Sequence, residues 1–225
     1  MEEAMIKPGL IVVFVLFAQV LFAQRHFIGV KGGINWSYAK TNTAFDGHDA
    51  ARRFQGGLTY RHQFNNGFYL GTDWIYAERG FENGLFTGDL LLDICPFCSR
   101  IAIPESDRFI YNYWSLPIKA GFTIGDNIMF FSDVAIVPSR LIHATDLSPY
   151  YPDGYGKPDE WDFAAQLEVG GAFRLYSRWA AYGSLSYLHG ITSATNNEYF
   201  PEENLFHRGA NFSFGVTYEL KVKTP

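Results

Sequence analysis

Apolar and polar residues alternate along most of the chain with a period of two, and this period restricts the possible folds more than any other sequence feature. The segment 210–220 shows the alternation clearly. Its apolar positions are Ala210, Phe212, Phe214, Val216, Tyr218 and Leu220. Its intervening positions are Asn211, Ser213, Gly215, Thr217 and Glu219. Successive side chains of a β-strand point to opposite sides, so the pattern predicts strands with one apolar and one polar face.

The same test applied to the whole chain predicts eight strands. They cover residues 26–37, 52–62, 67–79, 109–124, 128–138, 162–175, 178–189 and 208–221. Most of these segments have about ten residues or more, which a tilted strand needs to cross a bilayer. Strands of soluble sheets usually have about five or six residues. The fifth segment is apolar on both faces, so its pattern does not indicate which face points inward.

The connections between these strands alternate between short and long. Three are short and rich in residues that tolerate positive φ, namely 65–67, 125–127 and 176–177. The other four are long and polar, namely 38–51, 80–108, 139–161 and 190–207. Strict alternation places all the long connections at one end, as in transmembrane barrels. We therefore predict an all-β fold, an eight-stranded antiparallel up-and-down transmembrane β-barrel.

The N-terminal segment is typical of a secretory signal. An apolar stretch, Gly9–Ala18, precedes the small residue Ala23. We predict a signal peptide over 1–23, cleaved after Ala23, and one outer-membrane β-barrel domain over 24–225. A transmembrane anchor is the alternative, but it would need about 20 apolar residues, and glutamines interrupt this stretch.

The start of translation is open in the sequence. Glu2 and Glu3 oppose the basic residue Lys7, whereas a start at Met5 instead of Met1 would leave a basic region before the apolar stretch.

Composition excludes several functional classes. Only 18% of residues are charged, aromatic residues also make up 18%, and the formal net charge is −5. Without clustered lysine and arginine the chain is a poor partner for nucleic acid. It also lacks the His-Glu-x-x-His, Gly-x-Ser-x-Gly and phosphate-loop motifs. We therefore predict a non-enzymatic protein with no cofactor, catalytic residue or metal site.

Four segments carry a resemblance to a known family. They are residues 27–36, 113–121, 185–191 and 212–218, which read FIGVKGGINW, YWSLPIKAG, LSYLHGI and FSFGVTY. With them, the chain after residue 23 resembles the outer-membrane β-barrel domain family of Bacteroidetes, which includes PorT-like proteins. The resemblance implies a barrel and no particular reaction. PorT-like members are implicated in protein secretion, a role that we do not extend to this chain. Val134 and Ala135 depart from the pattern, where such proteins often carry glycine.

The polar faces of the predicted strands would line the barrel interior. The charged residues on these faces are Lys31, Arg61, Asp73, Arg79, Lys119, Glu168, Arg174 and Glu219. Eight strands enclose a lumen just wide enough for side chains to fill, and charges buried there must pair. A narrow ion path and a packed polar plug are both compatible with this pattern, and we prefer the plug.

Two long connections contain candidate functional residues. Cys95 and Cys98 form a Cys-x-x-Cys pair. This pair lacks the βαβ context of a redox motif, and two cysteines cannot complete a zinc site. In an exported protein a local disulfide is preferred. The connection 139–161 contains the predicted contact residues Tyr150, Tyr151, Tyr155 and Trp161, although an interfacial aromatic girdle would use the same residues. The carboxylates nearby match no calcium loop.

These patterns together predict an exported protein of the cell outer membrane. Its partners would be outer-membrane lipid, the barrel assembly machinery during biogenesis, and an extracellular or envelope protein bound by the long loops. Two alternatives remain at this point. One is a secreted lipocalin-like barrel, whose apolar face would point inward around an apolar ligand. The other is a hydrolase with serine, histidine and aspartate brought together at the barrel rim.

Overall fold

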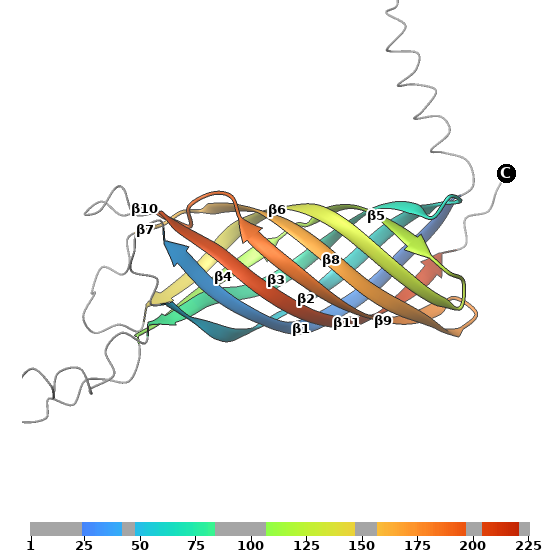
Figure 1. Ribbon diagram of the computed structural model, residues 1–225, viewed down its shortest axis with the longest axis horizontal. Helices are drawn as coiled ribbons and strands as arrows, with labels where there is room; N and C mark the ends of the chain where they lie inside the picture. Colours follow the sequence, from blue (N-terminus) through green and yellow to red (C-terminus); the bar gives the residue numbers. More distant parts are fainter. Residues whose placement is uncertain (1–23, 42–47, 84–106, 147–156, 197–203, 221–225) are drawn as a thin grey trace, which may run out of the picture.

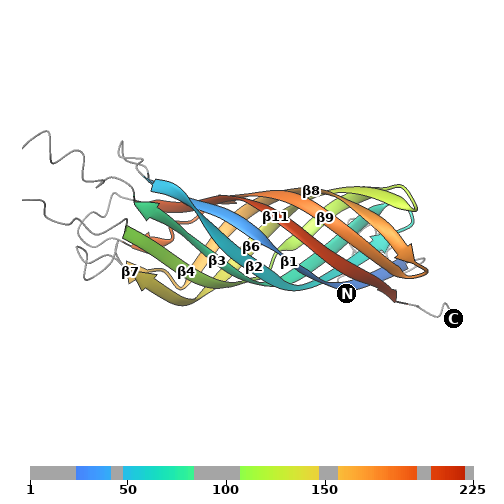
Figure 2. The same cartoon turned by 90° about the horizontal axis from the view of Figure 1, so that it is seen from below.

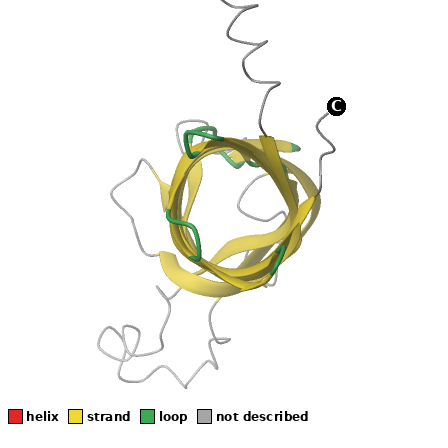
Figure 3. Ribbon diagram, turned by 90° about the vertical axis from the view of Figure 1, so that its right-hand side faces the viewer, coloured by secondary structure: helices red, strands yellow, loops and turns green. Residues whose placement is uncertain are grey.

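The protein is a β-barrel closed by backbone hydrogen bonds (Figures 1 and 3). The computed structural model describes residues 24–41, 48–83, 107–146, 157–196 and 204–220. The strands are β1 (Gln24–Thr41), β2 (His48–Phe64), β3 (Phe68–Asn83), β4 (Asp107–Ser115), β5 (Ile118–Ile124), β6 (Ile128–Asp146), β7 (Lys157–Pro158), β8 (Trp161–Tyr176), β9 (Trp179–Gly190), β10 (Thr195–Asn196) and β11 (Leu205–Leu220). No helix in these ranges is long and apolar enough to span a membrane.

The main sheet forms a ring with eight strand positions. Its order is β2-β1-β11-β9-β8-β6-β4-β3-β5, and the additional pairings β2–β3 and β6–β5 close it. Strands β4 and β5 both lie between β3 and β6, so together they occupy one position. Every pairing is antiparallel. The predicted eight-stranded antiparallel barrel is therefore confirmed, with a separate short ribbon formed by β7 and β10.

A proline interrupts the strand predicted over 109–124. Pro117 has no N–H to donate, and the strand divides there into β4 and β5. Hydrogen bonding nevertheless continues across the break. The backbone N–H of Leu116 donates to the carbonyl of Pro138 at 2.9 Å, and that of Asp73 donates to the carbonyl of Pro117 at 3.1 Å. The wall of the barrel is therefore continuous at this point.

The two ends of the barrel differ in their connections. Tight turns follow β2, β5 and β8 at the end on the right of Figure 1, which we call the turn end. Gly67, Gly125 and Ser177 adopt positive φ in these turns, at 84°, 99° and 39°. The third turn comprises residues 177–178 instead of the predicted 176–177. The opposite end, where the strands run toward the long connections, is the loop end (Figure 2).

Several strands extend further toward the loop end than the sequence predicts. Strand β6 runs to Asp146 instead of ending at 138, and β2 begins at His48 instead of 52. Near the loop end the outward residues become polar, so the alternation that marks a strand weakens. Backbone pairing does not depend on that contrast and continues.

The apolar faces point outward and the polar faces point inward. Outward residues of the first strand include Ile28, Val30, Ile34 and Trp36, whereas Lys31, Asn35 and Ser37 are buried. Strands β4, β5 and β8 show the same arrangement, with the large hydrophobic residues Trp114, Ile118, Phe122, Phe163, Leu167, Val169 and Phe173 exposed. This is the inverse of a soluble lipocalin-like barrel, so that alternative is wrong.

The structure also assigns the faces of β6, which the sequence left open. Ile128, Phe130, Val134 and Ile136 point outward, and each is 60–66% exposed. The intervening positions, including Asp133, are buried in the lumen.

Candidate functional site

Four oppositely charged side chains meet in the middle of the lumen. We call this group the charge ring: Lys31 of β1, Asp73 of β3, Lys119 of β5 and Glu168 of β8. The Lys31 ammonium nitrogen lies 3.0 Å from Asp73 Oδ2 and 3.6 Å from Glu168 Oε1. The Lys119 nitrogen lies 2.7 Å from Asp73 Oδ2 and 2.5 Å from Glu168 Oε2. Each cation therefore contacts both anions, and the formal charges cancel.

Burial explains why these charges must pair. All four residues are at least 92% buried, so none can be solvated by bulk water. An unpaired ion in such a place costs several kcal/mol. The four residues come from strands that are not all neighbours, and the ring therefore connects opposite walls of the barrel. It acts as an internal cross-brace.

A second layer of polar contacts lies beside the charge ring, toward the turn end. The Tyr69 hydroxyl donates to Asp133 Oδ2 at 2.5 Å. The Arg61 guanidinium lies over the rings of Tyr69 and Phe131, at 4.2 and 4.7 Å from their centroids. Gly121 permits this packing, because a Cβ there would lie 2.8 Å from the Tyr69 ring.

A third layer lies between the charge ring and the loop end, where Arg79 connects four strands. Its Nη1 donates to Asp162 Oδ2 at 2.5 Å, and its Nη2 donates to Ser115 Oγ at 3.2 Å and Ser139 Oγ at 3.0 Å. The guanidinium also lies 4.9 Å from the centroid of the Tyr113 ring. These contacts hold β3, β4, β6 and β8 together.

The loop end of the lumen is closed by a hydrophobic cluster. Its buried members are Ala39, Phe81, Phe109, Tyr111, Tyr113, Ala194 and Leu205. Fully buried His207 lies beside them, and its Nε2 shares a 3.2 Å hydrogen bond with the Tyr113 hydroxyl. This cluster separates the polar layers from the space beyond the strands.

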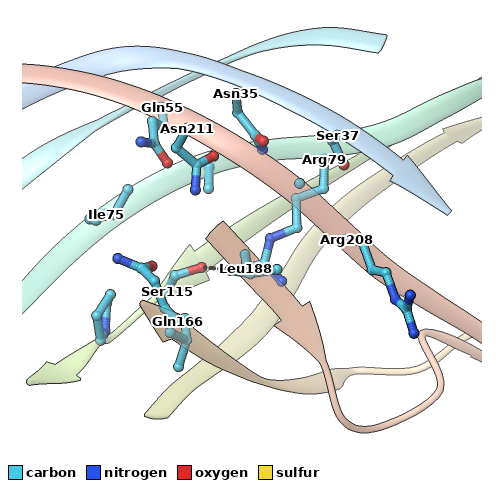
Figure 4. A pocket seen from close by; sticks show the side chains of 14 residues that line it. Asn35, Ser37, Gln55, Ile75, Arg79, Ser115, Gln166, Leu188, Arg208 and Asn211 are labelled. Carbon is cyan, nitrogen blue, oxygen red and sulfur yellow. Dashed lines mark hydrogen bonds between the residues drawn. The ribbon is translucent and has the colours of Figure 1, made fainter. Parts of the chain in front are cut away.

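The remaining internal space is small. One cavity of about 20 Å³ lies among Asn35, Gln55, Gln166 and Asn211 (Figure 4), and a second of about 20 Å³ lies near the turn end beside Arg61. A water molecule needs about 10–15 Å³ of such volume. Each of these two cavities therefore has room for about one water. The described lumenal side chains pack against one another as a polar plug would require, and the plug itself stays a prediction.

We expect the purified barrel not to conduct ions. Planar-bilayer recordings of protein reconstituted at neutral pH should show no stable steps, because the three layers and the hydrophobic cluster fill the lumen. Large, stable conductance steps from homogeneous protein would contradict this expectation.

The lumenal charges predicted from sequence lie in the interior, but two buried carboxylates were missed. The Arg174–Glu219 pair, with 3.6 Å between Nη2 and Oε2, lies at the turn end and is partly exposed. Asp133 and Asp162 were not among the predicted charges. Asp133 could have been recognised, because a lone charge in an apolar strand indicates its inward face. His207 had no comparable signal, since it falls in a segment predicted as a loop.

The predicted contact residues lie mostly outside the described ranges. This applies to Cys95 and Cys98 and to Tyr150, Tyr151 and Tyr155. Trp161 is described as the first residue of β8. It is 50% exposed and stacks on Phe163 with a centroid distance of 6.5 Å.

The residue types of a hydrolase do not assemble in the part of the chain that the structure describes. Ser115 and Ser139 are bound to Arg79 and to each other, and the hydrogen bond of buried His207 goes to a tyrosine. No group of three or more histidine, cysteine, aspartate or glutamate side chains in these ranges is arranged to hold a metal ion.

Comparison with known proteins supports the fold and leaves the family open. No family model matches the chain, and no curated protein matches it in sequence. Among solved structures, OprG from Pseudomonas aeruginosa has 10% identity and a TM-score of 0.55, over 89% of this chain and 97% of OprG. Neisserial surface protein A has 11% identity and a TM-score of 0.48, over 87% and 97% of the two chains. Ail of Yersinia pestis, solved with the heparin analogue sucrose octasulfate, has 13% identity and a TM-score of 0.45, over 87% and 99%. The likeness to OprG shows a shared fold of the small outer-membrane barrel type.

Proposed function

We propose that the protein is a small, non-enzymatic outer-membrane β-barrel whose loop end faces the outside of the cell. The inverted distribution of side chains is the observation that carries this proposal. Large apolar side chains cover the outer wall, and charged side chains are buried in the lumen. Soluble monomers rarely expose contiguous apolar patches above a few hundred Å². A lipid environment would instead bury this wall without any cost in unsatisfied polar groups.

The barrel would serve to hold its long loops at the cell surface, where they contact an extracellular or envelope protein. The packed side chains in the lumen support this role over transport. The exposure of Trp161 at the loop end is compatible with a contact surface that also includes Tyr150, Tyr151 and Tyr155. A local disulfide between Cys95 and Cys98 would stabilise its own loop. A rim-active hydrolase is the weaker proposal, because buried Ser115 and Ser139 bond to Arg79 and to each other, and buried His207 bonds to Tyr113.

Biogenesis follows from the same proposal. Residues 1–23 would direct export and be removed, and the barrel assembly machinery would insert residues 24–225 into the outer membrane. Membership of the PorT-like family remains a prediction from the sequence resemblance.

The proposal is tested by the topology of the protein in intact cells. Protease sites inserted singly near 45, 95, 150 and 200 should be cut by external protease, because they follow strand ends at the loop end. Sites inserted at 66, 126 and 177 should be protected until the outer membrane is permeabilised. If external protease cut only the second set of sites, the barrel would have the opposite orientation. If it cut neither set on the cell surface, the outer-membrane location would be contradicted.

A further inference from the structure

Near the loop end, the outer wall carries cations that lack an acidic partner among the side chains that the structure describes. Lys31, Arg79 and Lys119 inside the barrel all form ion pairs. Four cations on the outward face near the loop end form no ion pair with any carboxylate whose side chain the structure describes: Lys40, Arg52, Arg140 and Arg208. Their outward position follows from the alternation on β1, β2, β6 and β11.

Three of these cations lie together on adjacent strands. Strand β1 is flanked by β2 and β11, and its residue Tyr38 is paired with Arg208 across the β11 ladder. Arg52 is paired with Trp36, which is two residues from Tyr38 on the same face, and Lys40 is two residues away in the other direction. Directly opposed side chains have Cβ atoms about 5 Å apart, and diagonal neighbours lie about 7–8 Å apart.

Two tyrosines lie beside these charges: Tyr38 on β1, paired with Arg208, and Tyr187 on β9, paired with Ala210 of β11. The side chains of Tyr38 and Tyr187 hydrogen bond to each other, and both Lys40 and Arg208 act electrostatically on Tyr187. We call Tyr38, Lys40, Arg52, Tyr187 and Arg208 the basic patch. Glu78 also points outward near the loop end, but it lies on β3, with β2 between it and β1.

The basic patch lies at the border of the apolar wall. On the same three strands, the outward residues further toward the turn end include Ile34, Phe54 and Phe212, and all three are exposed. The turn end has no equivalent patch within the described ranges, because Arg25 and Arg174 both pair with Glu219 and Arg178 donates to the Tyr218 hydroxyl. The unpaired outward cations therefore mark one membrane interface only.

We propose that the basic patch binds the phosphate of a lipid headgroup in the outer leaflet. Arginine donates paired hydrogen bonds to phosphate oxygens, and lysine adds a compact positive charge. Long basic side chains at the end of an apolar wall extend toward the headgroups, where such phosphates lie. The inference rests on the proposed function, because it requires the loop end to meet the outer leaflet.

The test uses the full-length mature barrel and a matched control. The triple variant Lys40→Gln, Arg52→Gln and Arg208→Gln removes the charges of the basic patch and leaves the charge ring and the Arg79 contacts in place. Arg140→Gln removes an equally unpaired outward cation from β6, which is four positions from β1 in the eight-membered ring. Heat-dependent gel mobility and circular dichroism should show that both variants fold like the unmodified protein.

Binding is measured by native mass spectrometry and by titration in phosphatidylcholine nanodiscs that contain bis-phosphorylated lipid A. We expect the unmodified protein and Arg140→Gln to bind lipid A equally, and the triple variant to bind at least about tenfold more weakly. Removing the phosphates from lipid A should weaken its binding to the unmodified protein. The loss should equal the loss caused by the triple substitution with intact lipid A.

Other outcomes overturn the inference. Equal binding by the triple variant, or an equal loss in Arg140→Gln, would show that the patch is not a site. Competition by millimolar inorganic phosphate with no preference for lipid A would indicate a free-anion site instead. The protease accessibility of the loops distinguishes the two proposals. External loops with unchanged lipid binding in the triple variant would refute only the inference, whereas internal loops would refute the proposed function.

Discussion

Replacing Lys119 with methionine should destabilise the barrel by about 3–5 kcal/mol, which is the usual cost of removing one partner from a buried ionic group. Lys119 contacts both Asp73 and Glu168, so its loss leaves two buried carboxylates with Lys31 as the remaining cation of the charge ring. Methionine keeps much of the length of the side chain, which limits the contribution of lost packing. Reversible urea unfolding in lipid vesicles measures the effect.

Two further variants show whether the loss of stability comes from unbalanced buried charge or from the removal of any lysine. Adding Glu168→Gln to Lys119→Met leaves one cation and one anion in the ring, and should recover part of the lost stability. Lys40→Met removes an outward lysine that forms no ion pair with the described carboxylates, and should change stability by less than about 0.5 kcal/mol. If Lys119→Met were as stable as the unmodified protein, the charge ring would not be a brace.

Val134→Arg should cost about 2–4 kcal/mol or block assembly in the membrane, because an arginine at the bilayer midplane of a barrel wall is unfavourable by that amount. Val134 is 60% exposed, and it lies at the centre of the apolar outward run of β6 between Ile128 and Pro138. The fraction of protein that folds into vesicles, read from gel mobility without heating, measures the effect.

Depth provides the control on the same strand. Ile142 is also an outward aliphatic residue of β6, 48% exposed, but it lies near the loop end. Ile142→Arg should therefore cost only about 0–1 kcal/mol, the value found near an interface. Equal effects of the two substitutions would mean that the outer wall does not cross a bilayer.

The strand faces were predictable wherever polar and apolar residues alternate. The alternation placed Lys31 and Glu168 inward and Val30 and Leu167 outward, as the structure has them. It failed on β6, where both faces are mostly apolar. Strand ends were also missed near the loop end, since pairing there continues without an apolar outer face.

The partners of the lumenal charges could not be predicted from sequence. Lys31 and Asp73 are 42 residues apart, and Lys119 and Glu168 are 49 residues apart. Alternation fixes which way a side chain points, but not its height in the barrel relative to side chains on other strands. That height depends on the stagger of all eight positions, which is a property of the closed ring.

Closure of the ring has a consequence for the order of events during synthesis and export. β1 pairs with β11 in register from His26 to Thr41, so the first strand of the barrel to be made completes its hydrogen bonds only when the last has arrived. Until then, one edge of β1 stays open and able to pair with other chains. Closure of the ring must therefore follow the delivery of β11, and a chain released before that would expose the unpaired edge of β1. A chain interrupted before residue 205 would lack β11 and could not complete this ring.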